Sequence, residues 1–134
     1  MAVAASVLTS CLVTATSPSF GAYDPVANSA IDAANSLQVT CTIGTLYTVG
    51  LNVGAGTGAT VATRKMSNGI NLLNYSLYSN AARTLLWGAT VGIDTVAVTA
   101  GAVSTTLPVY GRIFAGQNVS PGNYTDLVNV TVNY

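Results

Sequence analysis

The sequence has 134 residues and a formal net charge of zero, because four Asp balance four Lys or Arg and there is no Glu. It has no His, so a Ser–His–Asp or Cys–His site would lack its base, and we predict that the chain is not an enzyme. No basic cluster exceeds Arg64-Lys65, which excludes the positive surface that nucleic-acid binding requires.

The composition predicts a polar but uncharged surface on one secreted domain. Half of the residues are hydrophobic and 6% are charged, so Thr, Ser, Asn and Gly must cover the surface. These residues do little to keep copies of the chain apart, which suits a protein that assembles. No apolar run reaches the length of a membrane span. Residues 1–10 lack the basic start of a signal peptide, so we expect a mature chain whose export signal is absent.

Cys11 and Cys41 each lie in an alternating, strand-like stretch. In a chain this poor in charge, the pair indicates a disulfide bond formed in an oxidising compartment. Two unpaired buried thiols are the alternative. A zinc site would need further ligands that the sequence does not offer, and we predict no cofactor and no metal.

Residue preferences favour β-strands throughout, because Val and Thr are abundant while Lys and Glu are nearly missing. Period-two alternation predicts half-buried strands at residues 37–43, 47–53, 73–77 and 128–134. For residues 26–35 we expect a loop or a short helical turn. Turn signals rich in Gly, Pro and Asn separate the strands, so the sequence predicts an all-β sandwich or barrel.

The C-terminal strand pattern places Val128, Val130, Val132 and Tyr134 on one face and runs to the last residue. In an immunoglobulin-like sandwich the penultimate strand is followed by one more strand, for which no residues remain. Either the sandwich uses fewer strands, or it lacks one and leaves a hydrophobic groove beside residues 128–134. An open edge of that kind is a template for another chain.

Several motifs, in their order along the chain, resemble the spore coat protein U domain family, which includes the major subunits of archaic (Csu-type) chaperone–usher pili. Each motif alone is weak, and together they cover most of the sequence. They are found at residues 10–13, 19–25 (Ser-Phe-Gly-Ala-Tyr-Asp-Pro), 37–41, 75–78, 81–84, 87–88 (Trp-Gly), 107–113 and 121–126 (Pro-Gly-Asn-Tyr-Thr-Asp).

The resemblance implies an incomplete immunoglobulin-like β-sandwich, formed by residues 11–134, that a donor strand from a neighbouring subunit completes. It implies a structural subunit of a cell-surface pilus that is exported through the periplasm. A periplasmic chaperone and an outer-membrane usher would assemble identical subunits head-to-tail by donor-strand exchange. The filament would support adhesion and biofilm formation.

The resemblance also assigns residues 1–10 as the donor-strand segment. The two registers of this extended segment offer different side chains to a groove: Val3, Ala5 and Val7, or Ala2, Ala4 and Leu8. Both sets are shorter and smaller than is usual for the family. Three interpretations are therefore open: a weak donor for a shallow groove, a donor truncated at Met1, or residues 3–13 as this domain's own first strand.

Two other functions remain open. One is a spore- or cell-coat protein that forms lateral layers. The other is a ligand-binding tip adhesin domain in which Trp87 contributes an aromatic platform.

We expect Asp126 to accept hydrogen bonds from nearby backbone, as carboxylates in turns do. Arg83 and Arg112 are expected to pair with Asp126 or Asp94 across strands.

Overall fold

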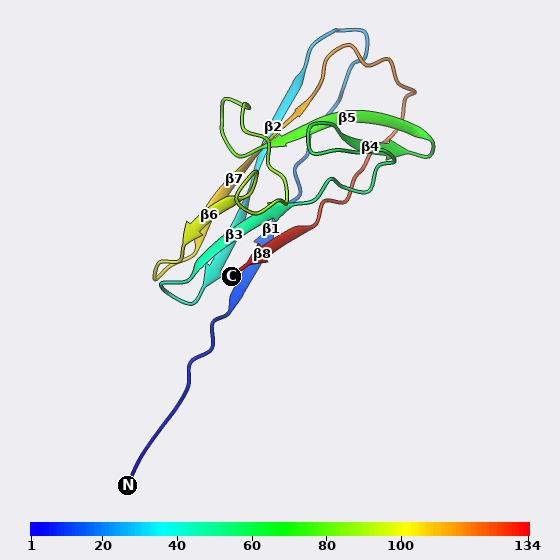
Figure 1. The fold of residues 1–134 in the computed structure, drawn as a ribbon. Helices are drawn as coiled ribbons and strands as arrows, with labels where there is room; N and C mark the ends of the chain where they lie inside the picture. The colour runs from blue at the N-terminus through cyan, green and yellow to red at the C-terminus, as the bar shows by residue number, and fades with distance from the viewer.

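The computed structural model describes all 134 residues, and its regular elements are β-strands alone (Figure 1). The composition explains this result, because β-branched residues fit a pleated, half-buried surface better than a helix. No helix long and apolar enough to cross a lipid bilayer is present. The strands are β1 (Cys11–Ala15), β2 (Ile31–Cys41), β3 (Leu46–Leu51), β4 (Arg64–Asn68), β5 (Asn71–Tyr78), β6 (Val96–Thr99), β7 (Thr105–Ile113) and β8 (Val130–Asn133).

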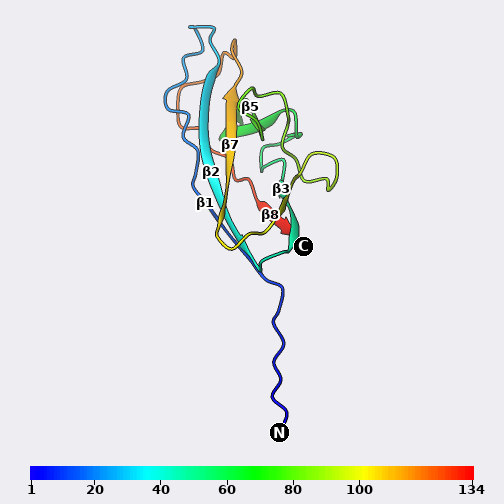
Figure 2. The same ribbon diagram turned by 90° about the vertical axis from the view of Figure 1, so that its left-hand side faces the viewer.

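The strands form two sheets that face each other. A five-stranded sheet has the order β1-β2-β7-β5-β4, and a three-stranded sheet has the order β6-β3-β8, with every pair antiparallel. Figure 2 shows β1, β2 and β7 on one side and β3 with β8 on the other. The predicted all-β sandwich is confirmed.

The core lies between the two sheets and follows the alternation of the strands. On β2, Leu37 and Val39 are 2% and 1% exposed, whereas Gln38 and Thr40, which alternate with them, face solvent. The same alternation buries residues of β3, β5 and β7, so both sheets contribute to one core. The buried hydrophobic residues are Leu37, Val39, Cys41, Tyr47, Val49, Leu51, Leu73, Tyr75, Leu77, Trp87, Ala100, Leu107, Val109 and Ile113.

The expectation of a loop or helical turn at residues 26–35 was wrong for the second half of that segment. β2 begins at Ile31, and its first five residues pair with β7, from Ile31 opposite Ile113 to Asn35 opposite Val109. These residues have weak strand preferences of their own. The neighbouring strand therefore determines their conformation, as is usual for β structure.

The charged pairing also differs from the prediction. Arg112 binds Asp32 through two hydrogen bonds, of 2.7 and 3.0 Å, and Arg83 lies 3.6 Å from the same carboxylate. Neither arginine pairs with Asp94 or Asp126. The hydrogen bond from Arg112 lowers the pKa of Asp32 below its ordinary value. The Asp32–Arg112 pair was not predicted because the sequence pattern did not indicate that residue 32 lies on a strand opposite residue 112.

Cys11 and Cys41 are joined by a disulfide bond, as predicted from the sequence. The two residues lie opposite each other at one end of the β1–β2 pair, and 30 positions separate them along the chain. The bond therefore attaches β1, an edge strand with a single neighbour, to the rest of the sheet.

Replacing both cysteines, as in Cys11→Ala with Cys41→Ala, is expected to lower the free energy of unfolding by about 3–4 kcal/mol, because a loop of this length is no longer closed in the unfolded chain. Urea denaturation followed by circular dichroism measures this loss. An unchanged denaturation midpoint would show that β1 is held by its backbone pairing alone.

Candidate functional site

Two sheet edges lie unpaired and face each other across the sandwich. β1 (Cys11–Ala15) pairs only with β2, and β8 (Val130–Asn133) pairs only with β3. The two strands belong to different sheets, so the backbone groups on their outer sides have no strand partner. A strand placed between them would find hydrogen-bonding groups on both sides.

An apolar groove with a volume of about 380 Å³ lies where β1 ends and β8 begins, and Ala15 and Val130 of these strands line it. Residues 15–18 form one wall, where the chain continues beyond β1, and residues 124–128 form the other, where it approaches β8. Core side chains from both sheets form the floor. Twelve of the 18 lining residues are hydrophobic, and the floor includes Leu37, Leu51, Tyr75, Leu77 and Val109.

Phe20 anchors the first wall to the sheet. Its ring meets the ring of Tyr75 edge-on, with the centroids 6.1 Å apart. It also lies against Gly111 of β7, where the Cβ of any larger residue would overlap the ring. The glycine therefore makes room for Phe20, and Phe20 holds residues 15–18 at the groove.

Asp126 anchors the second wall. Its Oδ1 atom accepts hydrogen bonds from the backbone N–H groups of Leu127 (2.8 Å) and Ala55 (2.7 Å), which confirms the expected backbone role. Its Oδ2 atom accepts a hydrogen bond of 2.5 Å from the hydroxyl of Tyr75, a partner that the sequence did not indicate. Burial, and then this hydrogen bond, raise the pKa of Tyr75 above its ordinary value.

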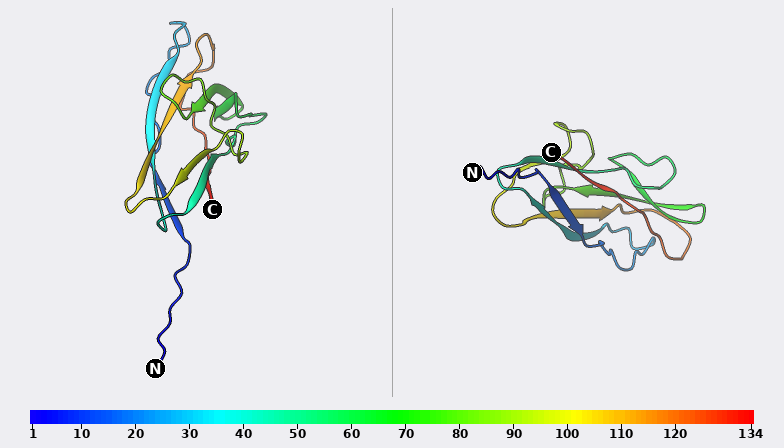
Figure 3. Two further views of the ribbon diagram at one scale, coloured as in Figure 1. Left: turned by 60° about the vertical axis from the view of Figure 1, so that its left-hand side comes forward. Right: turned by 90° about the horizontal axis from the view of Figure 1, so that it is seen from below.

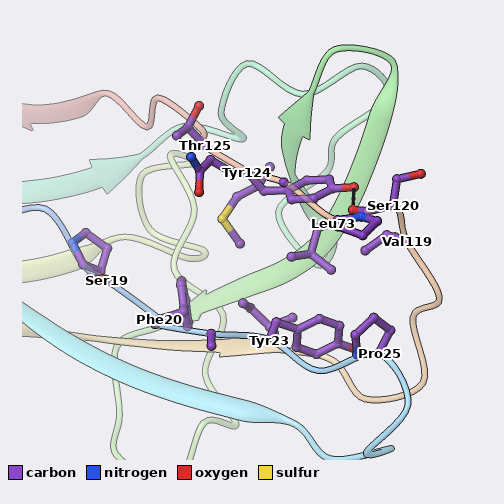
Figure 4. A pocket seen from close by; sticks show the side chains of 17 residues that line it. Ser19, Phe20, Tyr23, Pro25, Leu73, Val119, Ser120, Tyr124 and Thr125 are labelled. Atoms are coloured by element: carbon purple, nitrogen blue, oxygen red, sulfur yellow. Dashed lines mark hydrogen bonds between the residues drawn. The ribbon is translucent and has the colours of Figure 1, made fainter.

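A second cavity of about 860 Å³ continues the groove away from β8. It lies between residues 18–25 and 119–125, and Figure 4 shows Phe20, Tyr23 and Tyr124 around it. The hydroxyls of both tyrosines are occupied, since Tyr23 donates to the carbonyl of Phe114 and Tyr124 to that of Ser120. The two cavities share the lining residues Pro18, Phe20, Met66, Tyr124 and Thr125, so they form one cleft.

The side chains at the floor and at the rim of the groove differ in exposure. Leu37 and Leu51 on the floor are each 2% exposed, so the core is nearly sealed without any added strand. Val128 and Val130 on the rim are half-buried. A strand in the groove would therefore gain most from the rim side chains and from the two unpaired backbone edges.

The N-terminal segment, residues 1–10, is extended and lies outside the sandwich. It forms no strand, and Val3 and Val7 are 88% and 87% exposed, with Ala5 exposed as well. Figures 1 and 3 show it projecting away from the body of the molecule. The domain's own first strand begins at Cys11, so residues 3–10 are not part of it.

The structure places the residues predicted at the groove edge in three settings. Val130 and Val132 lie on β8, Val128 precedes it, and Tyr134 follows it with 63% exposure. The strand begins at Val130 and not at Val128 because its partner β3 ends at Leu51, opposite Val130. The sequence predicted no wall role for residues 15–18 or 124–127. Phe20, Tyr124 and Asp126 were visible in the family motifs, and of these only Asp126 had a predicted role, as an acceptor of backbone hydrogen bonds.

Trp87 does not form an exposed aromatic platform. It is 1% exposed, and its indole N–H donates a 2.9 Å hydrogen bond to the carbonyl of Val49. The side chain belongs to the core beneath β3. The structure also brings together no group of three or more His, Cys, Asp or Glu side chains that could hold a metal ion.

The model of the Spore Coat Protein U domain matches residues 1–131. The chain belongs to the spore coat protein U domain family. A relative in Myxococcus xanthus, Protein U, is 36% identical over 126 aligned residues, which cover 86% of this chain and 70% of Protein U.

The fold of this family member is similar to that of one chain of a solved chaperone–subunit complex. The similar chain is part of the crystal structure of the CsuC–CsuE chaperone–tip adhesion subunit pre-assembly complex from the archaic chaperone–usher Csu pili of Acinetobacter baumannii. The TM-score is 0.72 at 22% sequence identity, and the match covers 96% of this chain. The chain spans 40% of that longer protein.

Tyr75→Phe tests how strongly the Asp126 anchor holds. The folded protein retains the Tyr75 proton more tightly than the unfolded chain does. The contribution of the Tyr75 hydroxyl to the free energy of unfolding is therefore complete below pH 10, the usual tyrosine pKa of the unfolded chain, and is lost as the pH rises above it. At pH 7 the variant should unfold about 1–2 kcal/mol more easily. The difference from the unsubstituted protein should shrink between pH 10 and pH 12 in urea denaturation.

Tyr134→Phe is the matched control, because Tyr134 is exposed and lies after β8. Its stability should follow that of the unsubstituted protein at every pH. A Tyr75→Phe deficit that stays constant from pH 7 to pH 12 would contradict the role of the buried hydroxyl.

Proposed function

We propose that this chain is a structural subunit that polymerises head-to-tail by strand donation, with residues 1–10 of one copy filling the groove of the next. One observation carries the proposal: an apolar groove between two unpaired sheet edges occurs in the same molecule as an exposed, extended segment of alternating small apolar residues. The groove can accept a strand, and the N-terminal segment has an extended backbone with no strand partner.

The segment fits the groove in length and in side-chain size. Ten extended residues span about 33 Å, which is enough to run along β8 and the wall that precedes it. Filling the groove with Val3, Ala5 and Val7 contributes roughly 1.5–2 kcal/mol for each Val and less for Ala. Backbone hydrogen bonds to β1 and β8 add about 0.5–1.5 kcal/mol each. Small donor side chains suit a groove whose floor is already nearly sealed.

The direction of the donated strand decides what kind of assembly forms. We call the end of the sandwich where β1 begins and β8 ends the basal end; the N-terminal segment leaves from it (Figure 1). If the segment runs antiparallel to β8, the body of the donor subunit lies beyond the end of the acceptor that is opposite its basal end. The groove of the donor and the N-terminal segment of the acceptor then remain free at the two ends of the pair. A parallel segment brings two basal ends together and lets two copies close on each other. A filament therefore requires the antiparallel direction.

The family and the likeness to a chain from a chaperone–subunit complex support the wider pathway as part of this proposal. A periplasmic chaperone would cover the groove before assembly, and an outer-membrane usher would exchange it for the segment of the next subunit. The product would be an extracellular fibre of identical subunits that serves adhesion and biofilm formation. The protein then acts by assembly and not by catalysis.

Its membership of the spore coat protein U family favours a second candidate, a coat protein that forms lateral layers. Electron microscopy of the assembled protein separates the two. Strand donation produces filaments of constant diameter, whereas lateral association produces sheets or amorphous deposits.

The register of the donated strand can be tested with one pair of variants. If Val3, Ala5 and Val7 face the groove, Ala5→Arg should reduce multimer formation at least tenfold, because a charge would enter an apolar groove. Ala4→Arg places the same charge on the opposite face and should leave assembly near normal. Size-exclusion chromatography at equal protein concentration measures both. The reverse outcome would assign the groove to Ala2, Ala4 and Leu8.

The donor and acceptor roles can be separated in two complementary variants. A chain without residues 2–8 retains the groove, and Val130→Arg blocks the groove but retains the segment. We expect each alone to remain monomeric and a mixture of the two to form a heterodimer and nothing larger. Light scattering gives the mass of each species.

Ile70→Arg is the control for the acceptor variant, because Ile70 is 97% exposed in the turn between β4 and β5. It should assemble like the unsubstituted chain. Long multimers from the chain without residues 2–8 would overturn strand donation.

A further inference from the structure

Three hydrogen bonds to one residue hold the root of the N-terminal segment. The backbone N–H of Thr42 donates to the carbonyl of Ser10 (2.9 Å), which continues the β1–β2 ladder by one step. The hydroxyl of Thr42 accepts from the N–H of Ser10 (3.0 Å) and donates its one proton to the carbonyl of Leu8 (3.1 Å) or, at 3.4 Å, to that of Ser10. We call this set of bonds the Thr42 clamp.

The clamp lies where the chain would have to turn if a subunit filled its own groove. Residues 1–10 leave the basal end, whereas the groove lies toward the far end of the same two edges, at Ala15 of β1 and Val130 of β8. To enter that groove the segment would have to reverse its direction, and a reversal needs a turn of at least two residues. Because Cys11 is fixed by its disulfide bond, that turn falls on residues 8–10.

The clamp opposes this turn. It holds the backbone on both sides of Thr9 in line with β1, so that residues 1–7 continue outward, as Figures 1 and 3 show. A segment bent back on its own body would lose both hydroxyl bonds. It would also leave only residues 1–7 to cover the groove, about 23 Å of extended chain.

We infer that the Thr42 hydroxyl is a positioning group for strand donation: it directs residues 1–7 away from the subunit's own groove and so favours donation to another copy over self-closure. The inference rests on the proposed function, because it concerns which groove the segment enters. It adds a residue of the β2–β3 turn that does not line the groove.

Thr42→Val tests the clamp, because it keeps the shape and the backbone hydrogen bond but removes both hydroxyl bonds. Hydrogen exchange of the Ser10 amide, measured by NMR on dilute monomer, should accelerate about three- to tenfold, as expected for the loss of exposed hydrogen bonds. Thr14→Val is the matched control, since Thr14 is an exposed threonine of β1 outside the clamp. Its Ser10 amide should exchange as in the unsubstituted chain.

The second measurement is the distribution between monomer and multimer at equal concentration. In Thr42→Val the monomer share should rise about three- to tenfold, and the amides of β8 that face the groove should become protected in that monomer. Unchanged Ser10 exchange would overturn the clamp. Faster exchange with an unchanged monomer share would overturn its directing role.

Failure of strand donation itself has a different signature. In that case the unsubstituted chain forms no multimers that depend on residues 2–8. The groove-facing amides of the Thr42→Val monomer would still decide the inference. Their protection would support a clamp that prevents self-closure, and their free exchange alongside faster Ser10 exchange would refute it.

Discussion

An open edge on each of two sheets is the constraint on which the rest of this structure depends. The backbone groups on the outer sides of β1 and β8 must be satisfied by water or by another chain. The disulfide bond fixes the position of one edge and the Asp126–Tyr75 contact fixes the approach to the other, so the distance between them is set by the fold. The groove is therefore formed before any partner arrives, so the acceptor needs little rearrangement when a strand binds.

The balance of forces in this groove differs from that of an exposed core. Leu37 and Leu51 are almost free of solvent contact, so the sandwich does not need a guest to exclude water from its interior. A donated strand would then gain mainly from the rim side chains and from backbone hydrogen bonds to two edges at once. With that distribution, a segment as small as Met-Ala-Val-Ala-Ala-Ser-Val would suffice for the proposed donation. A nearly uncharged surface removes the repulsion that would oppose contact between copies.

Much of the fold could be predicted from sequence, because strand preference and period-two alternation act locally. The strands around Val39, Val49 and Tyr75 and the Cys11–Cys41 pairing were predicted in this way. Residues 31–35 were not, because only their pairing with β7 makes them a strand. For the candidate site, the alternation marked Val130 and Val132, whereas the wall at residues 15–18 follows from Phe20 packing on Gly111, a contact between distant segments. No pattern within one strand carries such information.

The outward direction of the N-terminal segment connects the fold to the form of the assembly. A segment free to turn at its root has three destinations: its own groove, the groove of a copy that donates in return, and the groove of a copy that donates onward. The first two give closed species with no free edge, and the third alone leaves one groove and one segment open at the ends. Fixing residues 8–10 in line with β1 removes the first destination. The antiparallel direction along β8 that a filament requires would remove the second. Growth of the proposed filament would then depend on how the root of the segment is held as much as on the groove that receives it.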